Sequence, residues 1–467
     1  MKNGAPRLCS GRQVRVTTRD DKKMPNLKKL KAFSGKAAIV GVAESDQIGK
    51  VPDKSPLALH AEAARNALDD AGLKLSDVDG FFTAGYSTYD VAEYLGLQPR
   101  FTDSTSVGGA SFVIHVAHAL AAVAAGYCEV ALITHGQSGR SDRARQPAHP
   151  GLPAAQYEAP YGIIGPPITY AMACRRYMHQ YGEERTRQAM AEIAVSTRKW
   201  ANLNPKAFFH DTPMSFDEYH NSRWIAWPFH LTDCCLVTDA GAAIVVTTPQ
   251  RARDCKKGGV EILGAAEGHD HSIISQMPDL TMPFGRNTGP QAMAMAGVKH
   301  ADFDLVMVYD SFTYTVLVTL ESLGFCKPGE GLELVKGQRT APGGAFPLNT
   351  NGGGLSYTHP GMYGIFTVVE AVRQLRGETG KRQVPGCELA LCHGTGGNLS
   401  STGTVVLGRR SQVTSDIEEA LEHALDEDSS VDQDVGRRGS LAARSRERPP
   451  VDRAPSKPGR TSRSPRR

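Results

Sequence analysis

Residues that could carry chemistry gather in one stretch of the chain, NTNGGGLSYTHPGMYG, which covers residues 349–364. Three consecutive glycines precede a tyrosine and a histidine, Tyr357 and His359. Glycine adopts backbone angles that other residues avoid, so Gly353 and Gly354 predict a place where a ligand approaches the main chain. The alternative is a plain loop in which His359 caps a helix or makes a structural hydrogen bond.

A helix is expected to follow this stretch, beginning near Pro360. Apolar residues then recur at helical spacing as far as Leu375, with polar residues between them. This pattern would place His359 at a helix N-terminus. Unpaired amide groups and the positive end of the helix dipole suit an oxygen that is gaining negative charge, such as that of an enolate.

The elements that must position this stretch begin with a buried strand over residues 36–45. A helix follows over 57–71, closed by Gly72, and a short strand lies in the sequence LSDVDGFFTAG. Strand and helix alternate, which predicts an α/β architecture with a central sheet.

A short sequence pattern, the echo, occurs once in each half of the chain. CEVALITHGQ, residues 128–137, and CELALCHGTGG, residues 387–397, follow the same course, and each comes after a glycine-rich turn and a helix. We interpret them as duplicated halves related by pseudo-symmetry, with a site where the halves meet. Chance similarity is the alternative, because the echo is short.

Segment boundaries follow from these patterns and from composition. We expect a disordered basic extension over 1–35, a first half over 36–257 and a second half over 258–410. A proline-rich excursion at 138–229 would cross over the site from the first half. Residues 411–467 are rich in charge, serine and proline and predict a disordered tail.

Bulk properties favour a large soluble protein that buries a real core, since 40% of its 467 residues are hydrophobic. The two ends of the chain are basic and the middle is nearly balanced in charge, so the net charge of +4 does not indicate a nucleic-acid-binding surface. No apolar run reaches the length that spans a bilayer, and no secretory signal opens the chain, so we expect a cytoplasmic protein. The nine cysteines predict reduced thiols, and the pair Cys234-Cys235 lacks a second pair at metal spacing, so we expect no metal site.

These motifs together resemble the thiolase superfamily, and within it the lipid-transfer and sterol-carrier branch. NGGGLSYTHPGMYG resembles the family's glycine-rich and Gly-His-Pro block, EAVRQLRGETGKRQVPG resembles the sterol-carrier branch, and CHGTGG takes the place of the C-terminal cysteine motif. The resemblance covers residues 36–408 and implies a five-layer αβαβα fold of two pseudo-symmetric halves. It also implies a homodimer that acts on acyl-CoA thioesters, with CoA as part of the substrate and no tightly bound cofactor.

The chain departs from the family at two positions. The family's nucleophilic cysteine would fall at about Gly109, where the sequence reads VGGAS, so the usual covalent intermediate cannot form there. In YDSF, residues 309–312, Tyr309 replaces the Asn or His that helps to bind the thioester carbonyl. A phenol can donate to an oxyanion or relay a proton, although Tyr309 could instead serve packing.

A reaction without the nucleophile remains possible. The resemblance to cysteine-less aldolases of steroid side-chain breakdown implies retro-aldol cleavage of a β-hydroxyacyl-CoA, assisted by a small oligonucleotide-fold partner that binds acyl-CoA. Tyr309 or Tyr357 would relay the proton and His359 would hold the thioester oxygen. The alternatives are an acyltransferase of the acetyl-CoA acetyltransferase or 3-ketoacyl-CoA thiolase type, and a non-catalytic acyl-CoA- or lipid-binding protein.

Further residues have two interpretations each. Cys392 could keep the family's acid–base role or be an inert core thiol. Arg140 and Arg143 could contact the CoA phosphates or belong to a solvated basic loop. Gly396 and Gly397 would let the pantetheine arm pass close to the backbone.

Overall fold

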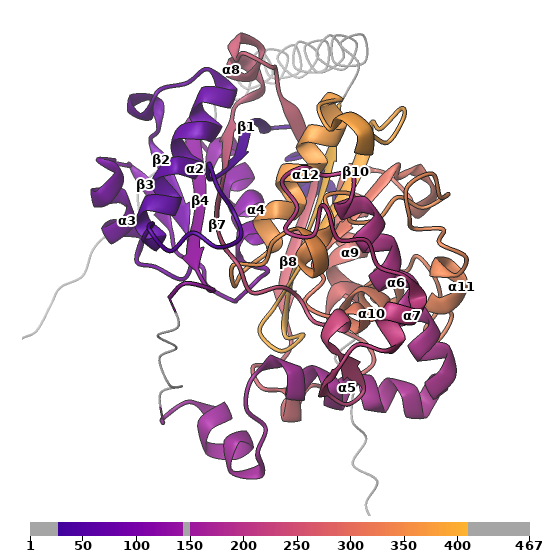
Figure 1. Cartoon of the computed structure of the whole chain (residues 1–467). Coiled ribbons are helices and arrows are strands. Elements are labelled where there is room, and N and C mark those ends of the chain that lie inside the picture. The colour runs from indigo at the N-terminus through magenta and orange to yellow at the C-terminus, as the bar shows by residue number, and fades with distance from the viewer. Residues whose placement is uncertain (1–26, 143–149, 410–467) are drawn as a thin grey trace, which may run out of the picture. The chain divides into compact units, whose positions relative to one another are not determined.

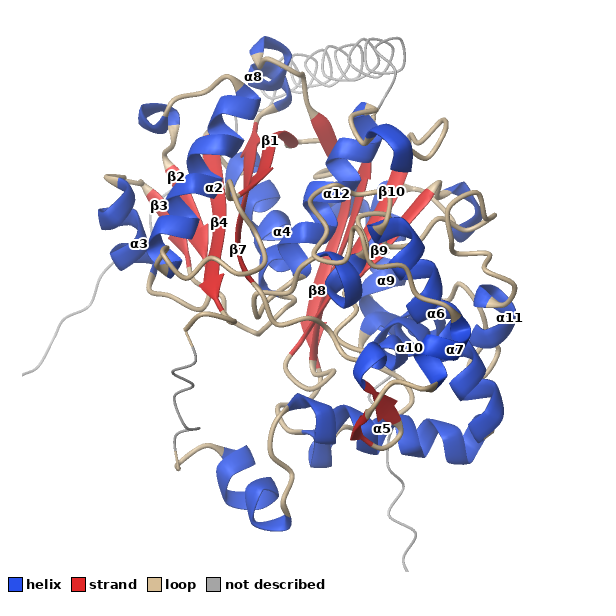
Figure 2. Cartoon of the chain, viewed as in Figure 1, coloured by secondary structure: helices blue, strands red, loops and turns tan. Residues whose placement is uncertain are grey.

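Strand and helix alternate through the first half of the chain, as the sequence predicts (Figures 1 and 2). The computed structural model describes residues 27–142 and 150–409. The elements of this half are β1 (Ala38–Glu44), α2 (Pro56–Ala71), β2 (Gly80–Thr83), α3 (Thr88–Leu95), β3 (Phe101–Asp103), α4 (Ser111–Ala124), β4 (Val130–Ser138), β7 (Asp239–Thr247) and α8 (Pro249–Asp254). Helix α2 ends where expected, because Gly72 adopts the left-handed conformation that closes a helix.

The second half repeats this order. Its elements are β8 (Val260–His269), α9 (Gly285–Ala296), β9 (Leu305–Val308), α10 (Thr313–Leu323), α11 (Gly331–Val335), α12 (Gly364–Arg376), β10 (Leu389–Gly396) and β11 (Ser401–Gly408). The two copies of the echo form β4 and β10, which pair antiparallel with β7 and β11 and parallel with β2 and β9. Pseudo-symmetric halves are therefore confirmed.

The strands follow the order β3-β2-β4-β7-β1-β8-β11-β10-β9. Within the described part of the chain, the strands of the two halves pair where Ala38 and Ile39 of β1 lie opposite Glu261 and Val260 of β8. Helices α4 and α12 contact each other and strands of both halves, so they form the middle layer between the two groups of strands (Figure 2). Helix α2 covers the strands of the first half and α9 covers those of the second half, which completes the five layers.

A long excursion separates β4 from β7. It contains α5 (Pro166–Tyr181), α6 (Glu183–Ala201), α7 (Phe216–His220), β5 (Trp224–Ala226) and β6 (Phe229–His230). Helix α6 packs on α10 and α11 of the second half and on the glycine-rich stretch. The excursion is thus a structured layer over the second half, and its residues 143–149 lie outside the described part of the chain.

Two expectations about boundaries need correction. Order begins before residue 36, because α1 (Leu27–Lys31) packs on α9 and the Gly35 amide donates to the Ile262 carbonyl. Residues 1–26 and 410–467 lie outside the described residues. The helix expected from Pro360 begins instead at Gly364, after a segment that runs along Thr238 and leaves no room for helical turns.

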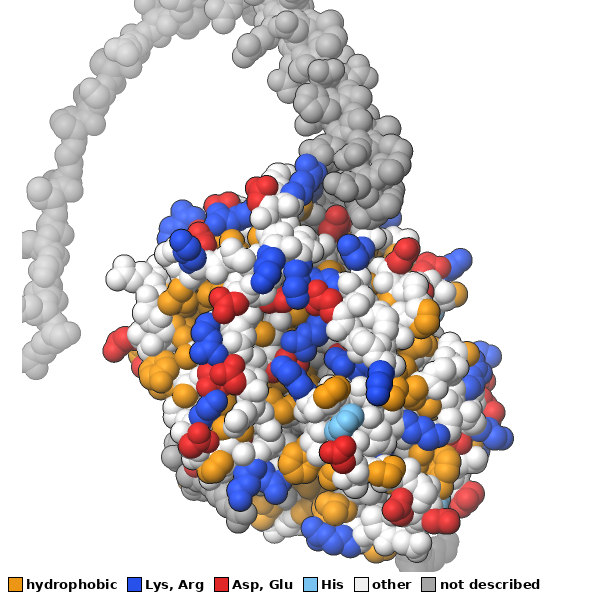
Figure 3. Space-filling view, turned by 45° about the horizontal axis from the view of Figure 1, so that its top comes forward, with side chains coloured by type: hydrophobic (Ala, Val, Ile, Leu, Met, Phe, Trp, Pro, Cys, Tyr) orange, Lys and Arg blue, Asp and Glu red, His pale blue; other side chains and the backbone are white. Residues whose placement is uncertain are grey.

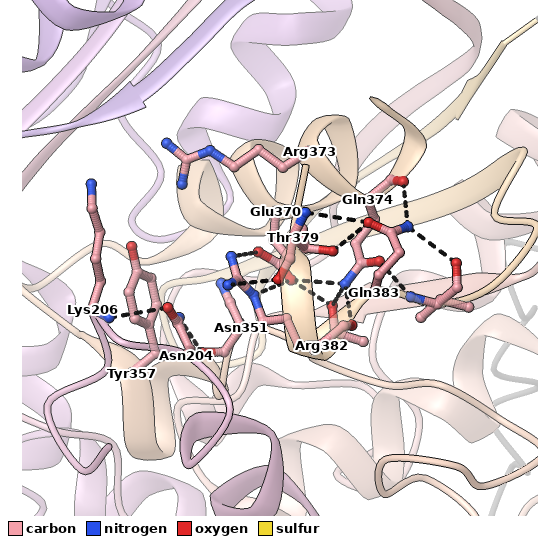
Figure 4. Close-up of polar contacts among 12 residues, drawn as sticks. Asn204, Lys206, Asn351, Tyr357, Glu370, Arg373, Gln374, Thr379, Arg382 and Gln383 are labelled. Atoms are coloured by element: carbon pink, nitrogen blue, oxygen red, sulfur yellow. Dashed lines mark hydrogen bonds and ion pairs between the residues drawn. The ribbon is translucent and has the colours of Figure 1, made fainter. Parts of the chain in front are cut away.

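Helix α12 is fixed by a buried ion pair. The carboxylate of Glu370 accepts two hydrogen bonds from the Arg382 guanidinium, both at 3.0 Å, and one from the Gln374 amide at 3.1 Å. Figure 4 shows the three side chains converging, with Thr379 and Gln383 beside them. Only 2% of the Glu370 side chain and 10% of the Arg382 side chain are exposed, so each charge depends on the other.

One face of the molecule carries charges of both signs. On the face seen in Figure 3, acidic and basic side chains are interspersed with apolar ones. Within the described residues, no helix is both long enough and apolar enough to cross a membrane.

Replacing Arg382 with methionine should destabilise the fold strongly. The substitution leaves the buried Glu370 carboxylate without its cation, which costs about 3–5 kcal/mol. Urea unfolding followed by circular dichroism would measure the loss. Lys299→Met is the matched control, since the Lys299 side chain is 77% exposed beside Asp302 and its loss should cost under about 1 kcal/mol. Equal effects of the two substitutions would contradict the assignment.

Candidate active site

A tyrosine and a histidine from different parts of the second half meet between the layers. Tyr309 directly follows β9, and its backbone amide donates to the His393 carbonyl of β10. The hydroxyl of Tyr309 lies 2.8 Å from Nε2 of His359. The two rings are nearly perpendicular, with centroids 5.6 Å apart. Sequence analysis singled out both residues, and the structure brings them together.

Burial sets the protonation states of this pair. Tyr309 is 5% exposed and His359 is 9% exposed. Removal from water lowers the pKa of His359 to about 4 and raises the pKa of Tyr309 well above its usual value. At neutral pH the pair is therefore a neutral phenol hydrogen-bonded to a neutral imidazole, which can accept a proton.

The Tyr309 ring occupies the space beside Gly109. A Cβ atom added at residue 109 would lie 2.5 Å from Cζ of Tyr309, closer than any real contact, and would also press on the Thr395 carbonyl. The φ angle of Gly109 lies outside the left-handed region, so space alone requires glycine here. No side chain fits at the position where the family's nucleophile would stand.

The glycine triplet packs against a carboxylate of the protein itself. Gly353 and Gly354 belong to a single turn of π-helix, η8 (Gly353–Tyr357). The Gly354 amide donates to Oδ1 of Asp310 at 2.6 Å, and the Leu355 amide donates to Oδ2 at 3.1 Å. An added Cβ at Gly353 would lie 2.8 Å from Cγ of Asp310, so the absence of a side chain admits the carboxylate.

The expected helix N-terminus at His359 is also absent. Helix α12 begins five residues later, at Gly364, and the His359 amide donates to Thr238 Oγ1 at 2.8 Å. The Thr238 amide donates to the His359 carbonyl in return. The histidine is held by this extended pairing, and helix-dipole stabilisation is not part of the site.

Tyr357 points into a different network from His359. Its hydroxyl donates to Glu44 Oε1 at 2.7 Å, and the same carboxylate binds Arg373 and Lys206. Figure 4 shows Tyr357 and Lys206 side by side, with Arg373 extending from α12. The phenol serves a buried charge cluster on β1, so a proton relay through Tyr357 does not fit this geometry.

Cys392 lies in the core of the sheet. It is 0% exposed on β10, and its thiol donates to the Thr367 carbonyl of α12 at 3.5 Å. Burial raises the pKa of this thiol, which opposes formation of the thiolate. The geometry favours the inert core thiol of the two interpretations.

Gly396 and Gly397 meet another segment of the chain. An added Cβ at Gly396 would lie 3.0 Å from the carbonyl carbon of Val107, and one at Gly108 would lie 2.7 Å from the Gly397 amide nitrogen. The close approach is therefore between the loop before α4 and the end of β10. Gly397 itself is exposed to solvent.

The two arginines expected at the CoA phosphates differ in what the structure describes. Arg140 is exposed at the end of β4, where Nη1 donates to the Val237 carbonyl at 3.3 Å and the guanidinium lies over the Phe208 ring. Arg143 lies outside the described residues.

Asp310 and Thr238 were missed at the level of sequence. Asp310 follows the apolar strand LVMV and Tyr309, and an acidic residue at the end of a buried strand could have signalled a site. Thr238 has no comparable signal, because it contacts His359 from a segment 121 positions away.

The arrangement can move a proton, whereas burial raises the pKa of the Cys235 thiol that interacts with Tyr309 and so opposes its use as a nucleophilic thiolate. A phenol and a neutral imidazole that are both buried form a short proton relay. The phenol ring also fills the space at residue 109, where the family's nucleophilic side chain would stand. Acid–base chemistry, in which a proton is taken up and returned, fits these groups better than covalent acyl transfer does.

Comparisons with known proteins identify relatives of this chain. Residues 266–409 match the family model described as thiolase C-terminal domain-like. The chain is 38% identical over 395 residues to the 17-hydroxy-3-oxo-4-pregnene-20-carboxyl-CoA lyase of Mycobacterium tuberculosis, covering 80% of this chain and 100% of the relative. It is 37% identical to a steroid side-chain-cleaving aldolase of Thermomonospora curvata, covering 74% and 92%.

Solved structures include one of similar sequence as well as similar fold. The Ltp2-ChsH2(DUF35) aldolase matches with a TM-score of 0.75 at 33% identity, covering 82% of this chain and 100% of that chain.

Substituting alanine for Gly109 should damage the site without unfolding the protein. The added methyl group must displace the Tyr309 ring, and a misplacement of about 1 Å can cost on the order of 10²-fold in rate. Turnover together with the melting temperature would separate the two effects. Gly126→Ala is the control just beyond the other end of α4. An added Cβ there meets nothing within 4 Å, and the positive φ of +76° strains an alanine, so this variant should lower the melting temperature and leave turnover unchanged. Unchanged turnover in Gly109→Ala would show that the contact does not matter.

Proposed function

The chain belongs to the thiolase superfamily, in its lipid-transfer and sterol-carrier branch, and from this premise we propose that it is a carbon–carbon lyase. It cleaves a β-hydroxyacyl-CoA into a ketone or aldehyde and a shortened acyl-CoA by a retro-aldol reaction. The observation that carries the proposal is the contact of Tyr309 with Gly109, which leaves a proton relay where a nucleophile would stand. Acyl transfer needs that nucleophile, whereas a retro-aldol reaction needs a base.

The proposed reaction begins at the β-hydroxyl of the substrate. Tyr309 takes the hydroxyl proton while its own proton passes to Nε2 of His359, 2.8 Å away. The electron pair of the former O–H bond forms the new carbonyl, and the bond between the α and β carbons breaks. Its electrons move onto the α carbon and the thioester oxygen, which gives the enolate of the shortened acyl-CoA.

The second proton transfer closes the cycle. His359 carries the proton after the first step, so a positive imidazolium lies beside the enolate oxygen and stabilises it. The proton then returns through Tyr309 to the α carbon, which restores both side chains and releases the acyl-CoA. Protons and electrons balance without a further reactant.

The dry environment suits this sequence. Burial lowers the pKa of His359 to about 4, so the imidazole starts neutral and can accept a proton at pH 7. The raised pKa of Tyr309 keeps the phenol protonated at rest. The positive imidazolium and the negative enolate exist only during the reaction, when the imidazolium charge stabilises the enolate.

The substrate class follows from the relatives. Two of them, at 38% and 37% identity over most of their length, are named as a steroid carboxyl-CoA lyase and a steroid side-chain-cleaving aldolase. We propose that this chain also acts in steroid or lipid metabolism, on a thioester whose β-hydroxyl belongs to a steroid-derived group. CoA is part of the substrate, and Arg140 would contact its phosphates.

Partner proteins are a further part of the proposal. The Ltp2-ChsH2(DUF35) aldolase carries two protein names in its title, and this supports an assembly of the present chain with a small DUF35-type protein of oligonucleotide fold. We also propose a homodimer formed along β3. That three-residue strand ends the sheet, and its outer edge has no partner among the described residues.

A direct assay separates the lyase from its alternatives. Purified protein, with and without a co-expressed DUF35-type partner, would be incubated with 17-hydroxy-3-oxo-4-pregnene-20-carboxyl-CoA. We expect a 17-ketosteroid and a short acyl-CoA, detected by mass spectrometry. A parallel reaction with a 3-ketoacyl-CoA and free CoA should give no thiolysis. CoA-dependent thiolysis would favour the acyltransferase, and saturable binding without either reaction would favour a binding protein.

Tyr309→Phe should remove turnover and preserve binding. Loss of the phenol oxygen breaks the relay, and general acid–base groups contribute typically about 10²–10⁴-fold to rate. Turnover with the β-hydroxyacyl-CoA and calorimetric affinity for it would be measured in parallel. Tyr314→Phe is the matched control, since this phenol on α10 is also buried and donates to the Leu280 carbonyl, away from the pair. A fall of similar size in both variants would argue against the relay.

A further inference from the structure

Asp310 is a fully buried carboxylate that holds the histidine-bearing loop by its backbone. Oδ1 accepts the Gly354 amide at 2.6 Å and Oδ2 accepts the Leu355 amide at 3.1 Å. Both oxygens are therefore occupied by main-chain donors. The absence of a side chain at Gly353 is what lets the carboxyl group enter the turn.

The same carboxylate is connected through the chain to both members of the proposed relay. Asp310 is the neighbour of Tyr309 along the chain, and the loop that it holds continues to His359. The space beside the Gly354 α carbon is bounded by Oδ1 of Asp310 and by Cδ2 of His359, each 3.1 Å from an added Cβ. A shift of the carboxylate would therefore move the loop against His359 and change its distance from Tyr309.

Only neutral groups face this carboxylate in the described part of the chain. They are Tyr309 on its own segment, Cys235 on the segment before β7, Tyr363 ahead of α12, and His359, whose imidazole is neutral at pH 7. Without a cation to offset burial, the pKa of Asp310 rises to about 7. The two amide donors oppose that rise but do not cancel it.

We propose that Asp310 is a positioning residue whose ionised carboxylate sets the distance between Tyr309 and His359, so that turnover depends on the ionisation of Asp310. This inference rests on the proposed lyase function. The ionised group accepts both amides through charge-assisted hydrogen bonds. Protonation turns one oxygen into an O–H donor, and one loop amide then loses its acceptor.

A pH dependence distinguishes this role from general support of the fold. Turnover of the natural chain should fall as a single proton is taken up near pH 7. His359 cannot cause that loss, because its pKa of about 4 places its protonation far lower. The stability effect has the opposite sign. The folded state binds the Asp310 proton more tightly than the unfolded state, so this contribution is present at low pH and is lost as pH rises from about 4 to 7.

The test is the pH profile of kcat for Asp310→Asn beside the natural chain, over about pH 5.5–8.5, with the β-hydroxyacyl-CoA as substrate. We expect the variant to lose the limb near pH 7 and to run at a flat rate reduced on the order of 10–10²-fold. Its melting temperature should gain on that of the natural chain as pH rises from about 4 to 7 and should keep a constant difference above that range. An unchanged limb in Asp310→Asn would overturn the proposal.

Two further variants keep the test decisive. Glu321→Gln removes another buried carboxyl whose pKa is raised, on α10, where it binds Tyr177 and Gly331 away from the site; it should leave the limb in place. If Asp310→Asn does not fold, Asp310→Glu retains a titrating group that is one methylene too long, and its limb should move. A limb of unchanged position in Asp310→Glu would refute the role. Absence of lyase turnover in the natural chain would instead refute the proposed function.

Discussion

The site depends on a single steric exclusion: a side chain at residue 109 and the Tyr309 ring cannot occupy the same space. Residue 109 lies just before α4 in the first half, and Tyr309 directly follows β9 in the second half. Only one of the two halves can therefore place a side chain in this space. In this chain the second half fills it, and a phenol stands where acyl transfer would require a nucleophile.

Burial between the layers of the fold determines the chemistry of this site. Tyr309 and His359 lie among α4, α12 and the strands of the second half, where almost no water reaches them. In such a setting a phenol and an imidazole stay neutral, and the hydrogen bond between them is stronger than in water. The same dryness raises the cost of every buried charge, so Glu44 and Glu370 each bind an arginine, whereas Asp310 has only amide donors.

Local sequence patterns predicted what depends on near neighbours. The strand over 36–45, the Gly72 cap and the echo that became β4 and β10 were all visible, because spacing and turn chemistry act within a few residues. Tyr309 and His359 were singled out as residue types in motifs. Their hydrogen bond was not predictable, because it joins positions 50 residues apart.

The errors had a common cause. The glycine triplet was interpreted as a ligand cradle, but the amide of its last residue, Gly354, binds Asp310, 44 residues away. The amide of the next residue, Leu355, binds the same carboxylate, 45 residues away. The partner of Tyr357 is Glu44, 313 residues upstream, so nothing near Tyr357 indicated that its phenol faces away from His359. The helix start was misplaced because Thr238 draws the segment around His359 into extended pairing. That cluster around Glu44 also implies that the two duplicated halves have lost their independence. Separated from α12, the first half would lose the Arg373 partner of Glu44 and keep only Lys206, so the charge balance of β1 is completed by the other half.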